Sequence, residues 1–182
     1  IEDPIEMIEP ALNQTQVQTV LDFGFAEGVR ALMRQDPDII MIGAIRDVET
    51  AEMAIQAALT GHLVFSTLHT NDAASAITRL TDLGVPPYLI GATVIGVLAQ
   101  RLARTLCVAC KEPDTEMSST RLDEAVAPFR LNGTPRPYKP VGCLDCRMTG
   151  YRGRAGLYEL MVLNDESREA LHQEVDMAAL RK

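Results

Sequence analysis

One stretch of the chain, from Asp36 to Asp72, restricts the possible folds more than any other. It contains two short apolar runs, Ile39 to Ile42 and Leu63 to Leu68, and each is too short to be a helix. Between them, apolar residues recur at helical spacing over 48–59, with Asp47 as the expected N-cap. A strand, a helix and a second strand over this length predict a parallel crossover unit of an α/β fold, with the first strand buried on both faces.

Polar residues follow each of the two predicted strands. In an open parallel sheet, the ligand crevice lies outside the carboxyl ends of the strands. Arg46 and Asp47 follow the first strand, and the second is followed by a polar group: Ser66, Thr67, His69, Asn71 and Asp72. We therefore expect the chemistry at this edge, where His69 could donate to a phosphate near neutral pH. His62 begins the second strand, and a histidine beside a core strand is more often a packed, hydrogen-bonded side chain.

The first six residues carry three carboxylates, Glu2, Asp3 and Glu6. They could serve a metal–phosphate site, or they could form an ordinary solvated turn, because charged residues are mostly exposed. The chain also starts at Ile1, without Met, at what looks like the end of a strand. We therefore expect a fragment whose beginning is missing.

Further elements are predicted on both sides of the crossover unit. Helical spacing over 25–34 places Arg30 and Arg34 one turn apart, either near a phosphate at a subunit boundary or as surface arginines near a helix C-terminus. After the crossover unit, Asn71 or Asp72 should cap a helix. The later elements predicted are a helix from Tyr88 to about Arg104, a strand over 156–163, and one or two helices over 165–182, capped by Asp165 and burying Leu171 and Leu180.

The four cysteines form two C-x-x-C pairs, Cys107 with Cys110 and Cys143 with Cys146. Two such pairs predict a tetrahedral, structural Zn²⁺ site, because each short loop brings two thiolates to one ion. Two disulfides are the alternative, but they require an oxidising compartment; a redox C-x-x-C would need only one pair. The composition therefore predicts three parts: an α/β core over 1–104, a tetracysteine zinc module over 105–155 and a C-terminal strand and helical segment over 156–182.

The overall composition excludes several classes of function. No apolar run reaches the roughly 18 residues that a membrane span needs, and the first residues show no basic region followed by an apolar core, the pattern of a signal peptide. The formal net charge is −8 and aromatic residues make up 4%. An acidic chain poor in aromatics does not favour nucleic-acid binding, which depends on Lys and Arg and often on base stacking.

These motifs, taken together and in order over essentially the whole chain, resemble the secretion ATPase superfamily. The similarity is greatest to the type II secretion and type IV pilus assembly ATPases, and it rests on the tetracysteine module and four stretches: IEDPIE, RQDPDIIMIGAIRD, TGHLVFSTLHTNDA and AQRL. The resemblance implies a RecA-like P-loop ATPase core, of which this chain holds the C-terminal part of the sheet. It further implies a homo-hexamer, ATP and Mg²⁺ as ligands, inner-membrane platform proteins as partners, and a cytoplasmic location peripheral to the inner membrane.

The resemblance also implies roles for individual residues. Glu2, Asp3 and Glu6 match the Asp box that faces Mg²⁺ and the attacking water, and Arg46 and Asp47 match the end of the Walker B region. His62 and His69 match the His box, with His69 near the γ-phosphate. Arg30 and Arg34 would lie near the ring interface. The four cysteines match a zinc module of many members that retraction ATPases generally lack, which favours the assembly side.

Two departures from the family pattern bear on activity. The chain has no G-x-x-x-x-G-K-[ST] loop, whose backbone amides and Lys hold the phosphates. Ala44 stands where the family carries the Walker B Glu, and Gly43 stands where many other ATPases place the Walker B Asp. A methyl group can neither polarise water nor help hold a metal. We therefore expect the parent to be a motor ATPase for pilin or pseudopilin assembly and this chain alone to be inactive. The alternatives are a zinc-containing docking module for the platform and a zinc-ribbon nucleic-acid binder.

Overall fold

The computed structural model describes residues 1–127 and 135–173, which belong to two compact units. Unit 1 consists of Ile1–Ala99 and the described residues from Glu159 onward, and unit 2 consists of Gln100–Tyr158. The predicted three-part division of the chain remains a prediction.

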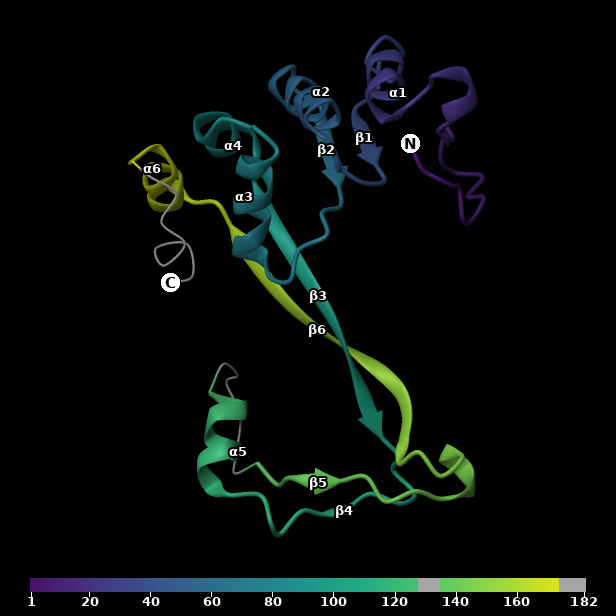
Figure 1. Ribbon diagram of the computed structural model, residues 1–182, viewed down its shortest axis with the longest axis vertical. Coiled ribbons are helices and arrows are strands. Elements are labelled where there is room, and N and C mark those ends of the chain that lie inside the picture. Colours follow the sequence, from purple (N-terminus) through teal and green to yellow (C-terminus); the bar gives the residue numbers. More distant parts are fainter. Residues whose placement is uncertain (128–134, 174–182) are drawn as a thin grey trace. The chain divides into compact units, whose positions relative to one another are not determined.

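The parallel crossover unit is confirmed. Strand β1 (Ile39–Ile42) pairs in parallel with β2 (Leu63–Ser66), from Ile39 opposite Leu63 to Ile42 opposite Ser66, and α2 (Val48–Leu59) connects them (Figure 1). The side chain of Asp47 caps α2 as predicted. The second strand ends at Ser66, two residues before the predicted end, so Thr67 and Leu68 begin the following loop.

Burial of β1 on both faces is wrong. Ile40 and Ile42 are 1% and 0% exposed and pack against α2 and α1 (Phe25–Leu32), but Ile39 and Met41 are 60% and 52% exposed. Side chains alternate between the two faces of a strand. The described helices α1 and α2 therefore cover only the face that carries Ile40 and Ile42.

Residues 1 and 2 run beside β1 on the edge away from β2. The backbone nitrogen of Ile1 donates to the Met41 carbonyl at 2.7 Å, and the Gly43 N–H donates to the Ile1 carbonyl at 2.8 Å. Glu2 in turn forms a parallel bridge with Gln16. A short 3-10 turn, η1 (Thr19–Leu21), leads from this segment into α1.

The predicted helix from Tyr88 to about Arg104 is correct only in its first part and wrong after Thr93. Helix α3 (Ala73–Asp82), capped by Asp72 as predicted, is followed by a short helix, α4 (Pro87–Thr93), and then by strand β3 (Gly96–Leu106). Prolines at 86 and 87 start α4. The following residues, Val94-Ile-Gly-Val97, combine β-branched side chains with glycine, which favours extended backbone over helix.

Strand β3 pairs with β6 (Tyr151–Val162), which begins before the predicted strand over 156–163. Their backbones are close at Gly96, where an added Cβ would lie 3.2 Å from the Met161 carbonyl oxygen. Helix α6 (Asp165–Gln173) then closes the core of unit 1, with Leu171 buried as predicted. Its cap is Asn164 instead of Asp165, because Asn164 Oδ1 accepts from the Ser167 N–H and hydroxyl at 2.8 Å each. Leu180 lies outside the described residues.

The described residues of unit 2 include the larger part of β3 and of β6 and, beyond these, only short elements. These are a two-stranded antiparallel sheet of β4 (Glu112–Pro113) and β5 (Tyr138–Lys139), helix α5 (Ser119–Val126), and a 3-10 turn, η2 (Leu144–Cys146). Within residues 1–127 and 135–173, no helix has the length and hydropathy of a membrane span.

Candidate functional site

Three separate segments meet at the carboxyl ends of β1 and β2. The Thr67 hydroxyl donates to the Gly43 carbonyl at 2.6 Å, and the Ile45 N–H donates to the Thr67 carbonyl at 3.1 Å. On the other side, Gly43 donates to Ile1. These bonds place the backbones of residues 1–2, 43–46 and 67–69 along one sheet edge, which we call the strand-end rim.

The rim has little room around Gly43 and Ala44. A Cβ on Gly43 would lie 3.1 Å from the Ile1 carbonyl oxygen and 3.4 Å from the Glu2 Cα. Real Cβ contacts are rarely so short, so an Asp at this position would have to displace the first residues of the chain. Ala44 is only 5% exposed. Any longer side chain at position 44 would begin in a buried position of the rim.

The three acidic residues of the first turn are not placed alike. Glu2 is half-buried, and its Oε1 accepts from Gln14 Nε2 at 2.8 Å. Asp3 and Glu6 are exposed. Of the three, only Glu2 is held by backbone hydrogen bonds, in its bridge with Gln16. It therefore has the most defined position at the rim. A Mg²⁺ role for the three carboxylates remains a prediction.

The structure places Arg46 and His69 at the rim, with both side chains exposed. Arg46 follows Ile45, and His69 lies two residues beyond Thr67, so both adjoin the backbone bonds that hold the rim together. Exposed cationic and imidazole groups at strand ends are suited to contacting an anionic ligand. Asp47 uses a carboxylate oxygen to cap α2, where Oδ1 accepts from the Thr50 N–H at 2.8 Å.

His62 lies at the opposite end of β2. Its Nδ1 is 2.9 Å from the Ala57 carbonyl oxygen and 3.0 Å from Thr60 Oγ1. A carbonyl can only accept, so Nδ1 carries the proton and ties the C-terminal turn of α2 to the start of the strand. The structure does not bring His62 together with His69.

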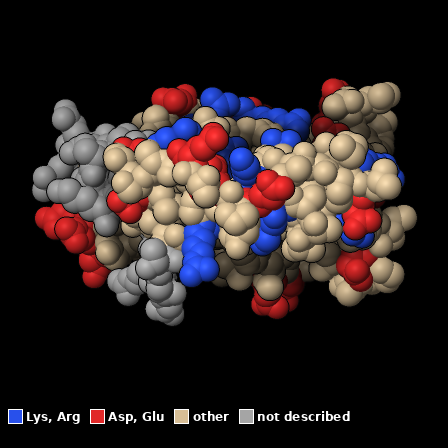
Figure 2. Space-filling view, turned by 90° about the horizontal axis from the view of Figure 1, so that it is seen from below, with Lys and Arg blue, Asp and Glu red and all other residues tan. Residues whose placement is uncertain are grey.

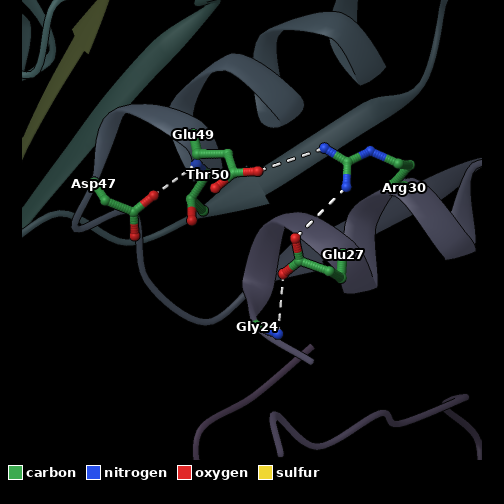
Figure 3. Close-up of polar contacts among 6 residues, drawn as sticks. All are labelled: Gly24, Glu27, Arg30, Asp47, Glu49 and Thr50. Carbon is green, nitrogen blue, oxygen red and sulfur yellow. Dashed lines mark hydrogen bonds and ion pairs between the residues drawn. The ribbon is translucent and has the colours of Figure 1, made fainter. Parts of the chain in front are cut away.

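Arg30 takes part in a polar network between α1 and α2 (Figure 3). Its guanidinium lies 3.5 Å from Glu27 Oε1 and 3.6 Å from Glu49 Oε1. Hydrogen bonds from the backbone N–H groups of Glu27 and Gly24 lower the pKa of the Glu27 carboxyl, and Arg30 adds to the effect. Arg34 is exposed on the same helix, and both arginines line a shallow hollow beside α1. Neither arginine is at the strand-end rim.

The four cysteines come together in unit 2, with all four sulfur atoms within 4.8 Å of one another. The Sγ–Sγ distances are 3.9 Å for Cys107–Cys143, 3.9 Å for Cys110–Cys146 and 3.7 Å for Cys143–Cys146. Four sulfurs about 2.3 Å from one tetrahedral Zn²⁺ would lie about 3.8 Å apart. The cluster therefore has the dimensions of a closed four-thiolate site, and all four cysteines are free instead of disulfide-bonded.

Hydrogen bonds to sulfur favour ionisation of one thiol in this cluster. Burial works against ionisation of Cys146, but the backbone N–H groups of Cys143 and Gly150 donate to its Sγ at 3.1 and 3.2 Å, and the net effect lowers its pKa to about 6. Burial raises the pKa of Cys110 to about 11, against a hydrogen bond from the Gly142 N–H. Deprotonation of Cys146 is thus favoured, as ligation of a metal would require.

Two contacts of the structure were not predicted from the sequence. Gln14 orients Glu2, and Glu159 Oε2 accepts from the Ala73 N–H at 3.1 Å. The sequence did mark Glu159 as unusual, because it is the one charged residue of the segment 155–163. No feature of the sequence marked Gln14, because the segment around it has no clear periodicity.

Figure 2 shows Lys and Arg side chains in blue and Asp and Glu side chains in red, and on the face drawn some acidic side chains lie among the basic ones.

The sequence matches the family described as "Type II/IV secretion system protein" over residues 1–182. It is 55% identical over 181 residues to the type IV pilus assembly ATPase TfpB of Acinetobacter baylyi, covering 100% of this chain and 31% of that protein. It is 49% identical to the type II secretion system ATPase E of Vibrio cholerae, covering 100% of this chain and 36% of that protein. The chain thus spans about a third of the length of these curated relatives.

Solved structures of similar fold are also ATPases. The pilus retraction motor PilT with bound ADP has a TM-score of 0.61 and 29% identity, covering 94% of this chain and 40% of that one. The Legionella pneumophila ATPase DotB has a TM-score of 0.62 and 26% identity, covering 98% of this chain and 41% of that one. The α/β fold of these ATPases is therefore the fold of this chain.

Proposed function

The chain belongs to the type II/IV secretion system protein family, and from this premise we propose that it is part of a motor ATPase that drives pilin or pseudopilin assembly. The observation that carries the proposal is the strand-end rim, where Glu2, Arg46 and His69 start from three segments joined by backbone hydrogen bonds. In the parent protein these groups would face the metal and phosphates of ATP. The ring would be a homo-hexamer in the cytoplasm, docked on inner-membrane platform proteins.

Hydrolysis in this proposal needs two features that the chain lacks, a phosphate-binding loop and a carboxylate at position 44. Glu2, Asp3 and Glu6 would hold Mg²⁺ or orient water, and the exposed side chains of Arg46 and His69 would contact phosphate oxygens. Bound Mg²⁺ would neutralise the charge that develops on the phosphates. The chain alone is then expected to bind ATP weakly and not to turn it over.

The test is a restored protein: the 182 residues joined at Ile1 to the upstream segment of the Acinetobacter relative, with Ala44→Glu. We expect phosphate release from ATP that depends on Mg²⁺. The matched control is the same fusion with Ala44 retained, which should be much slower because no carboxylate polarises the water. A fusion that folds, binds ATP and yet gains no rate from Ala44→Glu would contradict the proposal.

The cysteine cluster supports a second part of the proposal, a structural Zn²⁺ held by Cys107, Cys110, Cys143 and Cys146. Four thiolates complete the coordination shell, so the ion would stabilise the fold without taking part in catalysis. Unit 2 has few buried apolar side chains, so metal binding would supply much of its folding free energy.

A docking role for unit 2 is the second candidate function, and one observation favours it. Val108 and Leu144 lie inside the two C-x-x-C loops and are 81% and 90% exposed. Apolar side chains at such exposed positions are suited to contacting a partner protein. Capture of platform proteins by the restored protein should weaken when both are changed to Ser, while zinc content stays the same. Unchanged capture would exclude this role.

A further inference from the structure

The carboxylate of Glu159, on β6, contacts the helix that follows the loop carrying His69. Glu159 Oε2 accepts from the backbone N–H of Ala73, the first residue of α3, at 3.1 Å. Ala73 is 0% exposed, so water has little access to that N–H. Both residues belong to unit 1, although they are 86 positions apart in the sequence.

The contact completes the first turn of α3. The first N–H groups of a helix have no partner within the helix. Asp72 satisfies one of them, because its Oδ1 accepts from the Ser75 N–H at 2.8 Å and from the Ser75 hydroxyl at 2.7 Å. Glu159 supplies the acceptor for Ala73. A negative charge at this position is also favoured by the helix dipole.

His69 lies in a loop that is held at both ends. Thr67 holds the first end, through its hydroxyl to Gly43 and its carbonyl to Ile45. The second end is the start of α3, held by Asp72 and Glu159. The imidazole of His69 is exposed, so its position depends on these two anchors and on its neighbour Leu68, which packs against the core cluster.

One face of the part of β6 that carries Glu159 packs on the core of unit 1, whereas Leu160 and Val162 on the other face are exposed. Met161 is on the same face as Glu159 and packs against the core cluster that includes Ala74 and Ile77 of α3. Leu163 is 4% exposed, and its carbonyl accepts from Arg168 Nε at 3.3 Å. Glu159 therefore contacts α3 from a strand whose one face is anchored on the core.

We propose that Glu159 is a positioning residue that holds the start of α3 and thereby fixes His69 at the strand-end rim. The inference rests on the proposed ATPase function. Glu159 does not touch the nucleotide in this scheme; it acts through the Ala73 N–H and the loop 67–72. Misplacement of a catalytic group by about 1 Å can cost about 100-fold in rate.

Three substitutions separate the reach of the side chain from its charge. Glu159→Gln keeps an oxygen at the same reach without the charge, whereas Glu159→Asp keeps the charge but is one methylene too short. Glu159→Ala removes both, and Glu112→Ala is the matched control, since it removes an exposed strand carboxylate elsewhere. In the 182-residue chain, hydrogen exchange of the Ala73 amide should speed up about tenfold in Glu159→Asp and Glu159→Ala but not in Glu159→Gln or the control.

In the restored protein, kcat should fall about tenfold in Glu159→Asp and Glu159→Ala with little change in KM for ATP, and Glu159→Gln should stay near wild type. The opposite order, with Glu159→Asp active and Glu159→Gln impaired, would overturn the inference, because charge and not the hydrogen bond would then matter. Should Glu159→Ala fail to fold, the Asp and Gln variants still decide. An inactive wild-type restored protein would overturn the proposed function itself, whereas active wild type with unaffected Asp and Ala variants would overturn only the role of Glu159.

Discussion

Removing the carboxylate of Asp47 should destabilise unit 1 by a predictable amount. Asp47 Oδ1 accepts from the Thr50 N–H at 2.8 Å, and Thr50 is 2% exposed. Loss of an N-cap costs about 0.5–2 kcal/mol. Because water cannot readily reach the Thr50 N–H, we expect a loss of about 1–2 kcal/mol for Asp47→Ala, above the lower end of that range.

The measurement is urea unfolding of the 182-residue chain with zinc present, followed by circular dichroism. For a chain of this size, each kcal/mol corresponds to about 2–4 °C in Tm, which gives a second readout. Asp47→Asn keeps a side-chain oxygen at the same position and should retain most of the stability. Asp38→Ala, which removes an exposed carboxylate just before β1, is the matched control and should have little effect.

The same pair of variants tests the nucleotide role predicted for Asp47. If its carboxylate acts on ATP or at a subunit interface, Asp47→Asn in the restored protein will fold as stably as wild type and hydrolyse ATP more slowly. A loss below about 0.3 kcal/mol for Asp47→Ala, or an equal loss for Asn and Ala, would refute the capping argument.

Further predictions concern the cysteine cluster and the core. The reduced chain should bind one equivalent of zinc by metal analysis, and Cys146→Ser should abolish stoichiometric binding. Gly150→Ala should disrupt the cluster and lower zinc binding, because φ is +74° and the new Cβ would lie 2.5 Å from Pro140 Cβ. Gly153→Ala is the control, with φ +83° and no atom within 4 Å of the new Cβ; it should lower stability only through backbone strain and keep its zinc. Ile77→Ala should cost unit 1 about 2–5 kcal/mol in urea unfolding, since Ile77 is fully buried.

Local signals were enough to predict much of unit 1. The crossover unit was predictable because two apolar runs flank a segment of helical spacing with an Asp directly before it. Such local agreement between pattern and capping is characteristic of well-specified elements. The grouping of the cysteines was also predictable from local sequence. Each short C-x-x-C loop brings two thiols together, and two such pairs are typical of a four-thiolate metal site.

The incorrect predictions arose where pattern and tertiary pairing compete. Over 88–104 the apolar residues fit helical spacing, but β-branched residues and Gly96 allow the chain to pair with β6 over a long strand. The exposed face of β1 was missed because a run of four apolar residues says nothing about how many layers cover the strand.

The site could be predicted only at the level of segments. The strand ends placed residues 46 and 69 at the same sheet edge, because neighbouring parallel strands end there. The long-range contact between Glu159 and Ala73 depends on how β6 packs on α3, and no local pattern encodes that. Asp47 and His62 show the converse, since both have structural hydrogen bonds that a motif comparison does not distinguish from a catalytic role.

The pairing of β3 with β6 makes unit 2 an insertion whose entry and exit strands are joined by a ladder. Closing a long loop costs entropy that grows only slowly with its length, about 0.6 kcal/mol for each doubling. Here the ladder brings the two ends of the inserted segment together whether or not the segment is ordered. If the cysteines hold zinc as proposed, its removal should therefore unfold the cysteine loops while the fold of unit 1 stays intact.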